Sequence, residues 1–225
     1  MDNCIIEMKQ VSKTYHTGKS TIKALKNINF QVHKGDFTTI TGPSGSGKTT
    51  LLNIIGLLDE PTQGKVYLYN KEIITHDFDK LADMRAHNIS FIFQTFNLNP
   101  VLTVWENVMI PLYIRKDLIK AEKKRRVDEW VIKVGLEQHR NHRPDELSGG
   151  QRQRVAIARA MVAYPALVLA DEPTANIDSK TSHSILKLMK ELNKEKHTAF
   201  IFSTHDPLVR SYANKKCKLV DGVLL

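Results

Sequence analysis

Residues 42–50 read Gly42, Pro43, Ser44, Gly45, Ser46, Gly47, Lys48, Thr49 and Thr50. The first eight fit the pattern G-x-x-x-x-G-K-[ST], in which glycines allow backbone N–H groups to curl around a phosphate at the N-terminus of the following helix. Lys48 is placed to reach the β- and γ-phosphates of a nucleotide, and Thr49 to ligate magnesium. The stretch predicts that these nine residues bind a nucleotide, although many unrelated enzymes share the pattern.

The pattern occurs in the context that it requires. A β-rich run, Phe37 to Ile40, ends at the glycine loop, and residues 50–55 continue as an apolar helix behind it. Three further apolar runs, residues 89–93, 167–170 and 199–202, are typical of buried parallel strands, and helical patterns separate them. These features predict an α/β fold with a mostly parallel sheet.

A polar residue closely follows each of the three later strands. These residues are Gln94, Asp171 and His205. In open α/β sheets, ligands bind outside the carboxyl ends of the strands. We therefore expect the three side chains and the phosphate loop to converge at one edge of the sheet.

The remaining segments predict additions to this sheet. Residues 4–32 mix short apolar alternations with turn signals, which predicts antiparallel strands, one of which carries Tyr15. Residues 95–147 are mainly helical in pattern and predict a subdomain inserted into the sheet-bearing core. Residues 219–224 predict a hairpin around an Asp-Gly turn.

The bulk composition is that of one ordinary globular unit. The 225 residues are 41% hydrophobic and 25% charged, which is far from disordered or fibrous classes. The formal net charge of +9 suits nucleic acid, nucleotide phosphates or an anionic membrane surface, but the basic residues are spread along the chain. The densest basic run, residues 123–126, lies on a predicted amphipathic helix over 119–136. We interpret it as a solvated helix face, with nucleic acid or lipid headgroups as alternatives.

Other sequence features bear on the cellular compartment. Cys4 and Cys217 are too few and too far apart to indicate a metal cluster or a disulfide framework, which favours a reducing compartment. The N-terminus lacks the pattern of a signal peptide, and no stretch approaches the roughly 18 apolar residues of a membrane span. We therefore expect a cytoplasmic chain that reaches a membrane only through a partner.

A second glycine motif follows the helical segment, where residues 147–151 read Leu147, Ser148, Gly149, Gly150 and Gln151. Ser148 and Gln151 fit a capping box, which predicts a well-capped helix through residues 152–162. Two glycines are unfavourable in a first helical turn unless something approaches the backbone closely, and exposed N–H groups beside a serine hydroxyl form an anion site. We retain both interpretations. Because one phosphate loop already holds the nucleotide, the second motif is expected to bind the γ-phosphate of a nucleotide on another subunit.

With these motifs in this order, the chain resembles the nucleotide-binding subunit of an ATP-binding cassette (ABC) transporter over essentially its whole length. The resemblance implies a P-loop NTPase core of the RecA-like kind with an N-terminal antiparallel β subdomain. It also implies one domain over residues 1–225, with a helical subdomain at approximately 95–160 that includes the signature motif, residues 148–151. ATP and Mg²⁺ are the implied cofactors.

The resemblance also assigns roles to individual residues. Asp171 resembles the Walker B carboxylate that holds magnesium, and Glu172 would polarise the attacking water as general base. His205 resembles the switch histidine, which contacts the γ-phosphate. The alternatives are a buried carboxylate for Asp171, an ordinary surface carboxylate for Glu172 and a merely structural histidine for His205.

Three further residues match motifs of the same family. Gln94 resembles the Q-loop glutamine, which senses magnesium and the attacking water, while its loop contacts the membrane partner. Tyr15 resembles the aromatic residue that stacks on adenine, and Asp178 the D-loop aspartate that communicates between two ATP sites. The alternatives are an exposed glutamine, a packing tyrosine and a helix-capping aspartate.

Within the family, residues 91–98 and 103–108 resemble the lipoprotein-release and macrolide-export group, although Ala175 stands where members often have glycine. The resemblance implies a homodimer formed on ATP binding and a separate integral-membrane permease at whose cytoplasmic face the chain works, with no nucleic acid. The alternative is an ATPase that regulates a cell-wall hydrolase through a membrane partner, as in cell-division complexes. Residues 108–112 are either core or partner contact.

Overall fold

A computed structural model of the chain describes residues 3–18, 20–74 and 77–225. Its larger sheet has six strands in the order β10-β9-β3-β8-β7-β6. Neighbours from β9 to β6 are parallel, and β10 pairs antiparallel with β9. The strands are β3 (Phe37–Thr41), β6 (Ile89–Ile92), β7 (Leu167–Asp171), β8 (Ala199–Ser203), β9 (Lys215–Val220) and β10 (Val223–Leu224).

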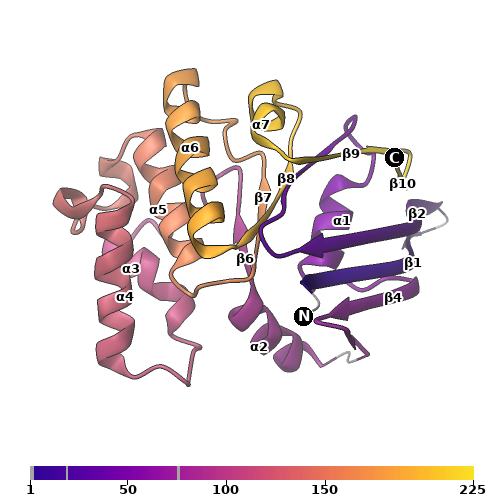
Figure 1. Ribbon diagram of the computed structural model, residues 1–225, viewed down its shortest axis with the longest axis horizontal. Coiled ribbons are helices and arrows are strands. Elements are labelled where there is room, and N and C mark those ends of the chain that lie inside the picture. Colours follow the sequence, from indigo (N-terminus) through magenta and orange to yellow (C-terminus); the bar gives the residue numbers. More distant parts are fainter. Residues whose placement is uncertain (1–2, 19, 75–76) are drawn as a thin grey trace.

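A second, antiparallel sheet is built mainly from the N-terminal segment. Its order is β2-β1-β4-β5, with β1 (Cys4–Thr17), β2 (Ser20–His33), β4 (Gln63–Leu68) and β5 (Lys71–Glu72). Helix α1 (Lys48–Ile55) lies beside this sheet (Figure 1). The buried side chains of α1 share one hydrophobic cluster with those of β1 and β2. The phosphate-loop helix is thus held by apolar contacts with the N-terminal sheet.

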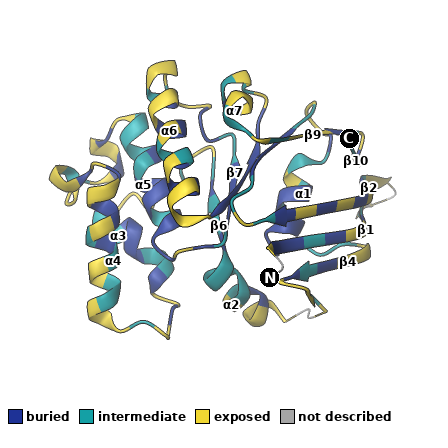
Figure 2. Cartoon of the chain, in the orientation of Figure 1, coloured by how far each residue is buried: buried dark blue, intermediate teal, exposed yellow. Residues whose placement is uncertain are grey.

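Helices α3 to α7 gather on the opposite side of the larger sheet (Figure 1), whereas α2 packs into the same cluster as α1. These helices are α2 (Phe78–Asn88), α3 (Val104–Met109), α4 (Lys120–Lys133), α5 (Gly149–Met161), α6 (Ser179–Lys196) and α7 (Pro207–Tyr212), with short 3-10 turns η1 (Ile110–Leu112), η2 (Glu137–His139) and η3 (Pro144–Glu146). Helices α4 and α6 are dark blue toward the interior in Figure 2 and yellow on the outside, whereas α3 and α5 carry only buried and partly buried residues. This amphipathic pattern is what one-sided packing requires.

The larger sheet separates two hydrophobic cores, because alternate side chains along a strand point to opposite faces. One core contains the buried side chains of α3 to α6 together with Val168, Ala170, Phe200 and Phe202. The other contains those of α1 and the N-terminal sheet together with Leu167, Leu169, Ala199 and Ile201. Strands buried on both faces carry near-continuous apolar runs. Because both faces of these strands are buried in the two cores, the strands appear in the sequence as continuous apolar runs.

The α/β fold, the antiparallel N-terminal strands and the parallel strands are confirmed. The Asp-Gly turn is present, since Asp221 and Gly222 have φ of 47° and 78° between β9 and β10.

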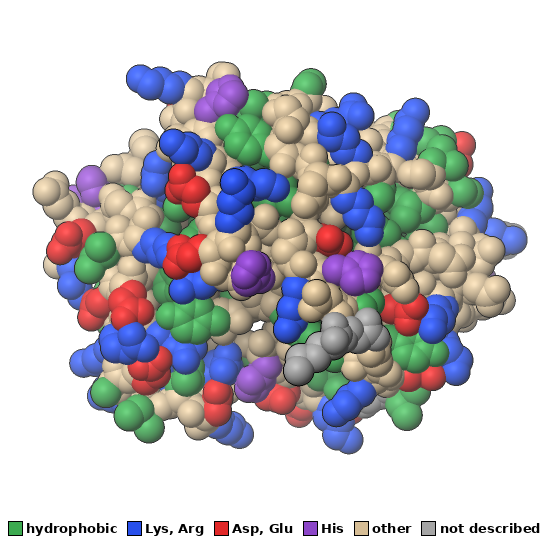
Figure 3. All heavy atoms as spheres, in the orientation of Figure 1, with side chains coloured by type: hydrophobic (Ala, Val, Ile, Leu, Met, Phe, Trp, Pro, Cys, Tyr) green, Lys and Arg blue, Asp and Glu red, His purple; other side chains and the backbone are tan. Residues whose placement is uncertain are grey.

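On the face in Figure 3, Lys and Arg side chains are interspersed with acidic ones. Within the basic run, Arg125 pairs with Glu122 and Glu129, as expected of a solvated helix face. In the described part of the chain, no helix is both long and apolar enough to cross a bilayer.

Candidate functional site

The carboxyl ends of four parallel strands meet at one edge of the larger sheet. Ile40 at the end of β3 pairs with Ser203 of β8, and Ser203 pairs with Asp171 of β7. Ala170 pairs in turn with Ile92 of β6. The phosphate loop after β3, the acidic residues after β7, Gln94 after β6 and His205 after β8 therefore all leave the sheet at the same edge, as the sequence predicted.

The phosphate loop needs glycine at particular positions. A Cβ on Gly42 would lie 2.0 Å from the carbonyl oxygen of Leu219 and 2.7 Å from Oγ of Ser46. Gly45 and Gly47 have φ of 77° and 101°, which side-chain-bearing residues rarely adopt. Gly47 is the N-cap of α1, so the left-handed turn aims the first N–H groups of the helix into the loop.

Lys48 and Thr49 lie in the first turn of α1. The Nζ of Lys48 donates hydrogen bonds to the carbonyl oxygens of Gly42 (2.8 Å) and Pro43 (2.9 Å), so the ammonium lies over the loop. An open pocket of about 700 Å³ adjoins the loop. It is lined by Tyr15, Ile22, Lys23, Ala24, Lys26, Ser44, Gly45, Gly47, Lys48, Thr49, Thr50, Asp221 and Gly222. Its size and basic lining suit a nucleotide.

Tyr15 comes to this pocket from β1. Its hydroxyl donates a 2.6 Å hydrogen bond to Oδ2 of Asp59. Burial and this hydrogen bond raise the pKa of Tyr15, so its phenol is neutral at physiological pH. The structure thus places the aromatic ring and the phosphate loop in one pocket.

Glu172 is held in a strained conformation beside His205. Its φ of 44° lies in the left-handed region, and its N–H donates to the carbonyl of Ser203 (2.9 Å). One carboxylate oxygen lies 2.6 Å from Nδ1 of His205, and the other accepts from the hydroxyl of Thr204 (3.0 Å). The His205 side chain is 80% exposed, whereas that of Glu172 is 16% exposed. The carboxylate is therefore fixed at the sheet edge, next to an accessible imidazole.

The oxygens of Thr49 and Asp171 fit magnesium rather than a softer metal. Thr49 offers a hydroxyl and Asp171 a carboxylate, which are hard donors of the kind that Mg²⁺ prefers. Among the described residues there is no cluster of three or more His, Cys, Asp or Glu that could hold a metal by itself. A Mg²⁺ held by few protein oxygens and by nucleotide phosphates suits such a sparse donor set.

The turn after β6 is tied to two other elements. The backbone carbonyl of Gln94 accepts a 2.7 Å hydrogen bond from Nδ2 of Asn176. Phe96 and Asn97 have φ of 63° and 47°, and the Arg159 guanidinium on α5 donates to both of their carbonyls. The Gln94 turn is thus fixed to the segment after β7 and to α5, the helix that follows residues 148–151.

Residues 148–151 form the predicted capping box at the start of α5. The Ser148 hydroxyl accepts from the N–H of Gln151 (3.3 Å), and Oε1 of Gln151 accepts from the N–H of Ser148 (2.8 Å). A Cβ on Gly150 would lie 2.4 Å from the methyl of Thr181, and one on Gly149 would lie 3.1 Å from the carbonyl of Asn176. Part of the need for two glycines is therefore packing within the chain itself.

Asp178 lies next to these glycines, as the N-cap of α6. Its side chain accepts from the N–H of Thr181 (2.9 Å), and hydrogen bonds from the Thr181 hydroxyl and from this N–H lower the pKa of the carboxyl. The capping alternative for Asp178 is thus realised.

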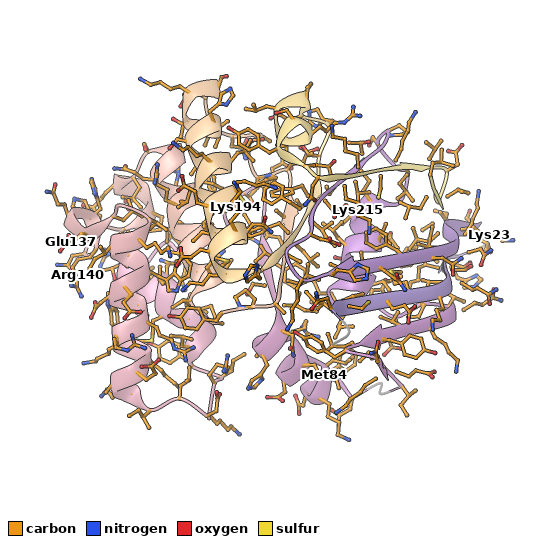
Figure 4. The ribbon with its side chains drawn as sticks, in the orientation of Figure 1. Lys23, Met84, Glu137, Arg140, Lys194 and Lys215 are labelled. Atoms are coloured by element: carbon orange, nitrogen blue, oxygen red, sulfur yellow. The ribbon has the colours of Figure 1, made fainter. Side chains whose placement is uncertain are left out.

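Residues 148–151 lie away from the phosphate loop of the same chain. None of them is among the described residues that line the phosphate-loop pocket. Gln151 lies 3.0 Å from the ring of His139, in η2. Figure 4 labels the flanking Glu137 and Arg140 at the opposite end of the molecule from Lys23, which lines the pocket. One chain therefore cannot bring both the phosphate loop and residues 148–151 to one nucleotide.

A shallow apolar groove lies between α2, β6 and η1. It is lined by Leu58, Ala82, Arg85, Ala86, Ile89, Ser90, Phe91, Phe93, Asn97, Ile110, Pro111, Ile114, Arg159 and Ala160. Within residues 108–112, Val108, Met109 and Leu112 are buried, whereas Ile110 and Pro111 line the groove. The core interpretation therefore holds for Val108, Met109 and Leu112, whereas Ile110 and Pro111 are surface residues of the groove.

Sequence reasoning missed two residues that organise the site. Asp59 contacts Tyr15, and Arg159 contacts the Gln94 turn. Both contacts join residues far apart in the chain, and neither Asp59 nor Arg159 belongs to a sequence motif that predicts its partner. Only the fold reveals them.

Comparisons with known proteins agree with this geometry. A sequence model described as ABC transporter matches residues 25–175. The lipoprotein-releasing system ATP-binding protein LolD of Francisella tularensis is 46% identical over 224 residues, covering 100% of this chain and 97% of that protein. The macrolide export ATP-binding/permease protein MacB of Syntrophobacter fumaroxidans is 41% identical, covering 98% of this chain and 31% of that protein.

A solved structure is similar over nearly the whole fold. It is the dimeric structure of a post-hydrolysis state of the ATP-binding cassette MJ0796 bound to ADP and Pi, from Methanocaldococcus jannaschii. Its TM-score is 0.87 at 45% sequence identity, with 97% of this chain and 95% of that chain covered. The similarity therefore includes both the pocket at the phosphate loop and the helix after residues 148–151.

Proposed function

The chain belongs to the ABC transporter family, and we propose that it binds and hydrolyses ATP with Mg²⁺ to power a separate membrane permease. It is an ATP-binding subunit of the type found in lipoprotein release and macrolide export. The observation that carries the proposal is the position of two phosphate-recognition elements at distant parts of one chain. We assign residues 1–225 to one ATPase domain and approximately 95–160 to its helical subdomain.

In our proposal, the pocket at the phosphate loop binds one ATP. Residues 42–50 surround the phosphates with backbone N–H groups, and Lys48 turns from the loop carbonyls to the β- and γ-phosphates. Tyr15 stacks on the base. Thr49 and Asp171, with Gln94 nearby, hold Mg²⁺, which neutralises charge on the phosphates.

Hydrolysis then depends on the residues at the ends of β7 and β8. Glu172 accepts a proton from the attacking water, and His205 contacts the γ-phosphate, with Gln94 orienting the water. The fixed carboxylate lies close to the imidazole, so both groups are positioned before the nucleotide arrives. Catalysis is mostly positioning and electrostatic stabilisation of the phosphoryl group, to which Lys48 and the N-terminus of α1 contribute.

The second half of each ATP site comes from a second copy of the chain. In a head-to-tail homodimer, residues 148–151 of one subunit face the γ-phosphate bound by the other, and Asp178 lies at the boundary between the two sites. The dimeric MJ0796 structure with ADP and Pi supports this arrangement. Loss of the γ-phosphate removes a contact across the dimer, so hydrolysis lets the subunits separate.

The permease is expected to dock on the groove between α2, β6 and η1. This groove is apolar and borders the Gln94 turn, so a docked segment would sense the nucleotide through that turn. Docking places the chain at the cytoplasmic face of a membrane through its permease. We expect no nucleic-acid partner, and in the densest basic run Arg125 and Arg126 are both paired with Glu122 of their own helix.

Affinity purification of a Glu172→Gln variant from native membranes in ATP and Mg²⁺, followed by mass spectrometry, tests this function. Slowed hydrolysis should trap the assembled complex and enrich a permease relative to wild type. Glu191→Gln, an exposed carboxylate change on α6, is the matched control and should show no enrichment. A division-type membrane protein would favour regulation of a cell-wall hydrolase instead. Ribosomal or DNA-bound material would overturn the membrane function.

A further inference from the structure

The carboxylate of Asp59 joins two side chains of β1 at the edge of the nucleotide pocket. Asp59 lies in the segment 56–62 between α1 and β4, and residues 59–62 of that segment form a loop beside β1. Its Oδ2 accepts from the Tyr15 hydroxyl (2.6 Å), and its Oδ1 lies 2.5 Å from Nζ of Lys13. The side chains of Asp59 and Lys13 are only 26% and 13% exposed. This is a partly buried ion pair with an added phenol, not a loose surface contact.

Lys13 fixes the same ring from a second direction. Its Nζ lies 5.0 Å from the centroid of the Tyr15 ring, within the range of a cation–π contact. The same ammonium donates to the carbonyl of Glu60 (2.7 Å). Asp59 therefore holds the hydroxyl end of the tyrosine, and Lys13 covers one face of its ring. A nucleotide base would have the other face on which to stack.

The 59–62 loop also clamps the backbone of β1 around these residues. The N–H of Thr62 donates to the carbonyl of Ser12 (2.8 Å), and the Thr62 hydroxyl accepts from the N–H of Thr14 (3.0 Å). The β1–β2 pairing is irregular on both sides of Lys13. Tyr15 itself pairs in regular register with Ile22 of β2, so the ladder fixes its backbone. The loop fixes the irregular stretch of β1 that leads into Tyr15 and, through Asp59, the tyrosine hydroxyl.

The charge states of Asp59 and Tyr15 favour the hydrogen bond between them. Burial acts to raise the pKa of Asp59, but hydrogen bonds from Lys13 and Tyr15 outweigh it and lower the pKa below its usual value. Burial and the Asp59 contact raise the pKa of Tyr15. At neutral pH the carboxylate is a charged acceptor and the phenol a neutral donor, the combination that makes the stronger hydrogen bond.

We propose that Asp59 is a positioning residue for nucleotide-base recognition, which holds the Tyr15 ring where a base stacks. The inference rests on the proposed contact between Tyr15 and the base of ATP. Because Asp59 lies four residues after the end of the phosphate-loop helix at Ile55, it ties the base contact to the element that binds the phosphates. Its loss should weaken ligands that carry a base and spare those that do not.

The test compares ATP with inorganic tripolyphosphate, which has the phosphates but no base, by titration calorimetry on the full chain with Mg²⁺. Asp59→Asn keeps the shape but weakens both contacts, and we expect it to weaken ATP binding about tenfold, the scale of one hydrogen bond to a charged group. Tripolyphosphate affinity should be unchanged, which also shows that the variant is folded. Tyr15→Phe should weaken ATP similarly, and the double variant should lose little more. Asp79→Asn, an exposed carboxylate change on α2, is the control.

The Tyr15→Ala variant separates the base contact of Tyr15 from the positioning role of Asp59. If it weakens ATP but Asp59→Asn does not, Tyr15 contacts the base without help from Asp59 and the inference is overturned. If Asp59→Asn weakens ATP and tripolyphosphate equally, Asp59 serves the general fold and the inference is also overturned. If Tyr15→Ala leaves ATP binding unchanged, the proposed base contact itself is wrong and the inference falls with it.

Discussion

A Gly150→Ala substitution would test why α5 begins with two glycines. The new Cβ would lie 2.4 Å from the Cγ2 methyl of Thr181, whereas the next nearest atom, the Cβ of Thr181, lies at 3.6 Å. Threonine is stiff at χ1 in a helix, so the methyl does not turn away freely. The overlap therefore involves a single methyl group, which Thr181→Ser removes.

The expected magnitude follows from two opposing effects. Overpacking costs about 1–3 kcal/mol, and replacing glycine by alanine in a helix returns about 1 kcal/mol. Gly150→Ala should therefore lower the free energy of unfolding by about 0–2 kcal/mol. At about 2–4 °C per kcal/mol for a chain of this size, Tm falls by up to about 8 °C. In the Thr181→Ser background the same change should be neutral or stabilising.

Urea denaturation of the four proteins in this double-mutant cycle measures the effect. We expect a coupling of about 1–3 kcal/mol between the two positions. A coupling near zero would refute the packing argument. ATPase activity gives a separate result: if Gly150 also leaves room for the γ-phosphate of the opposite nucleotide, the double variant recovers stability but not activity.

Three further perturbations test other contacts. Ser148→Ala removes the cap of α5 and should cost about 1 kcal/mol of folding free energy, measured by urea denaturation; an unchanged transition midpoint would contradict the capping role. Arg159→Met removes the donors to the carbonyls of Phe96 and Asn97, so amide exchange in this turn should accelerate relative to wild type while the exchange of β7 stays the same. The hydrogen bonds to Asp59 outweigh the effect of burial and lower the pKa of this carboxyl in the folded state. The charged carboxylate therefore stabilises the fold at pH values above the unfolded-state pKa of about 3.9. The Tm advantage of wild type over Asp59→Asn should therefore be full above about pH 5 and shrink as pH falls through the lowered folded-state pKa; an advantage that persists unchanged at the acid limit of folding speaks against this contact.

Features encoded by neighbouring residues were predictable from the sequence. The strand, glycine loop and helix around Lys48 follow from one contiguous pattern, and Ser148 and Gln151 are three positions apart, so the capping box follows from helix geometry. The sheet edge was predictable because parallel strands place their carboxyl ends together.

Features that depend on distant partners or on exact backbone angles were not predictable. The predicted helix over 119–136 spans only Lys120–Lys133, because Val134 leaves the helical conformation and Gly135 turns left-handed. The left-handed φ of Glu172 has no sequence signal, since glutamate rarely adopts it. The Tyr15 to Asp59 contact spans 44 positions, and apolar periodicity carries no information about it.

The two cores on opposite faces of the larger sheet have a genetic consequence. One core supports α1 and the phosphate loop, and the other supports α5 and residues 148–151. In the head-to-tail dimer that we propose, each ATP site would combine the phosphate loop of one subunit with residues 148–151 of the other. A subunit defective only in the phosphate loop and a subunit defective only in residues 148–151 would therefore complement each other when mixed. Their heterodimer concentrates both lesions in one ATP site and leaves the other site wholly wild type.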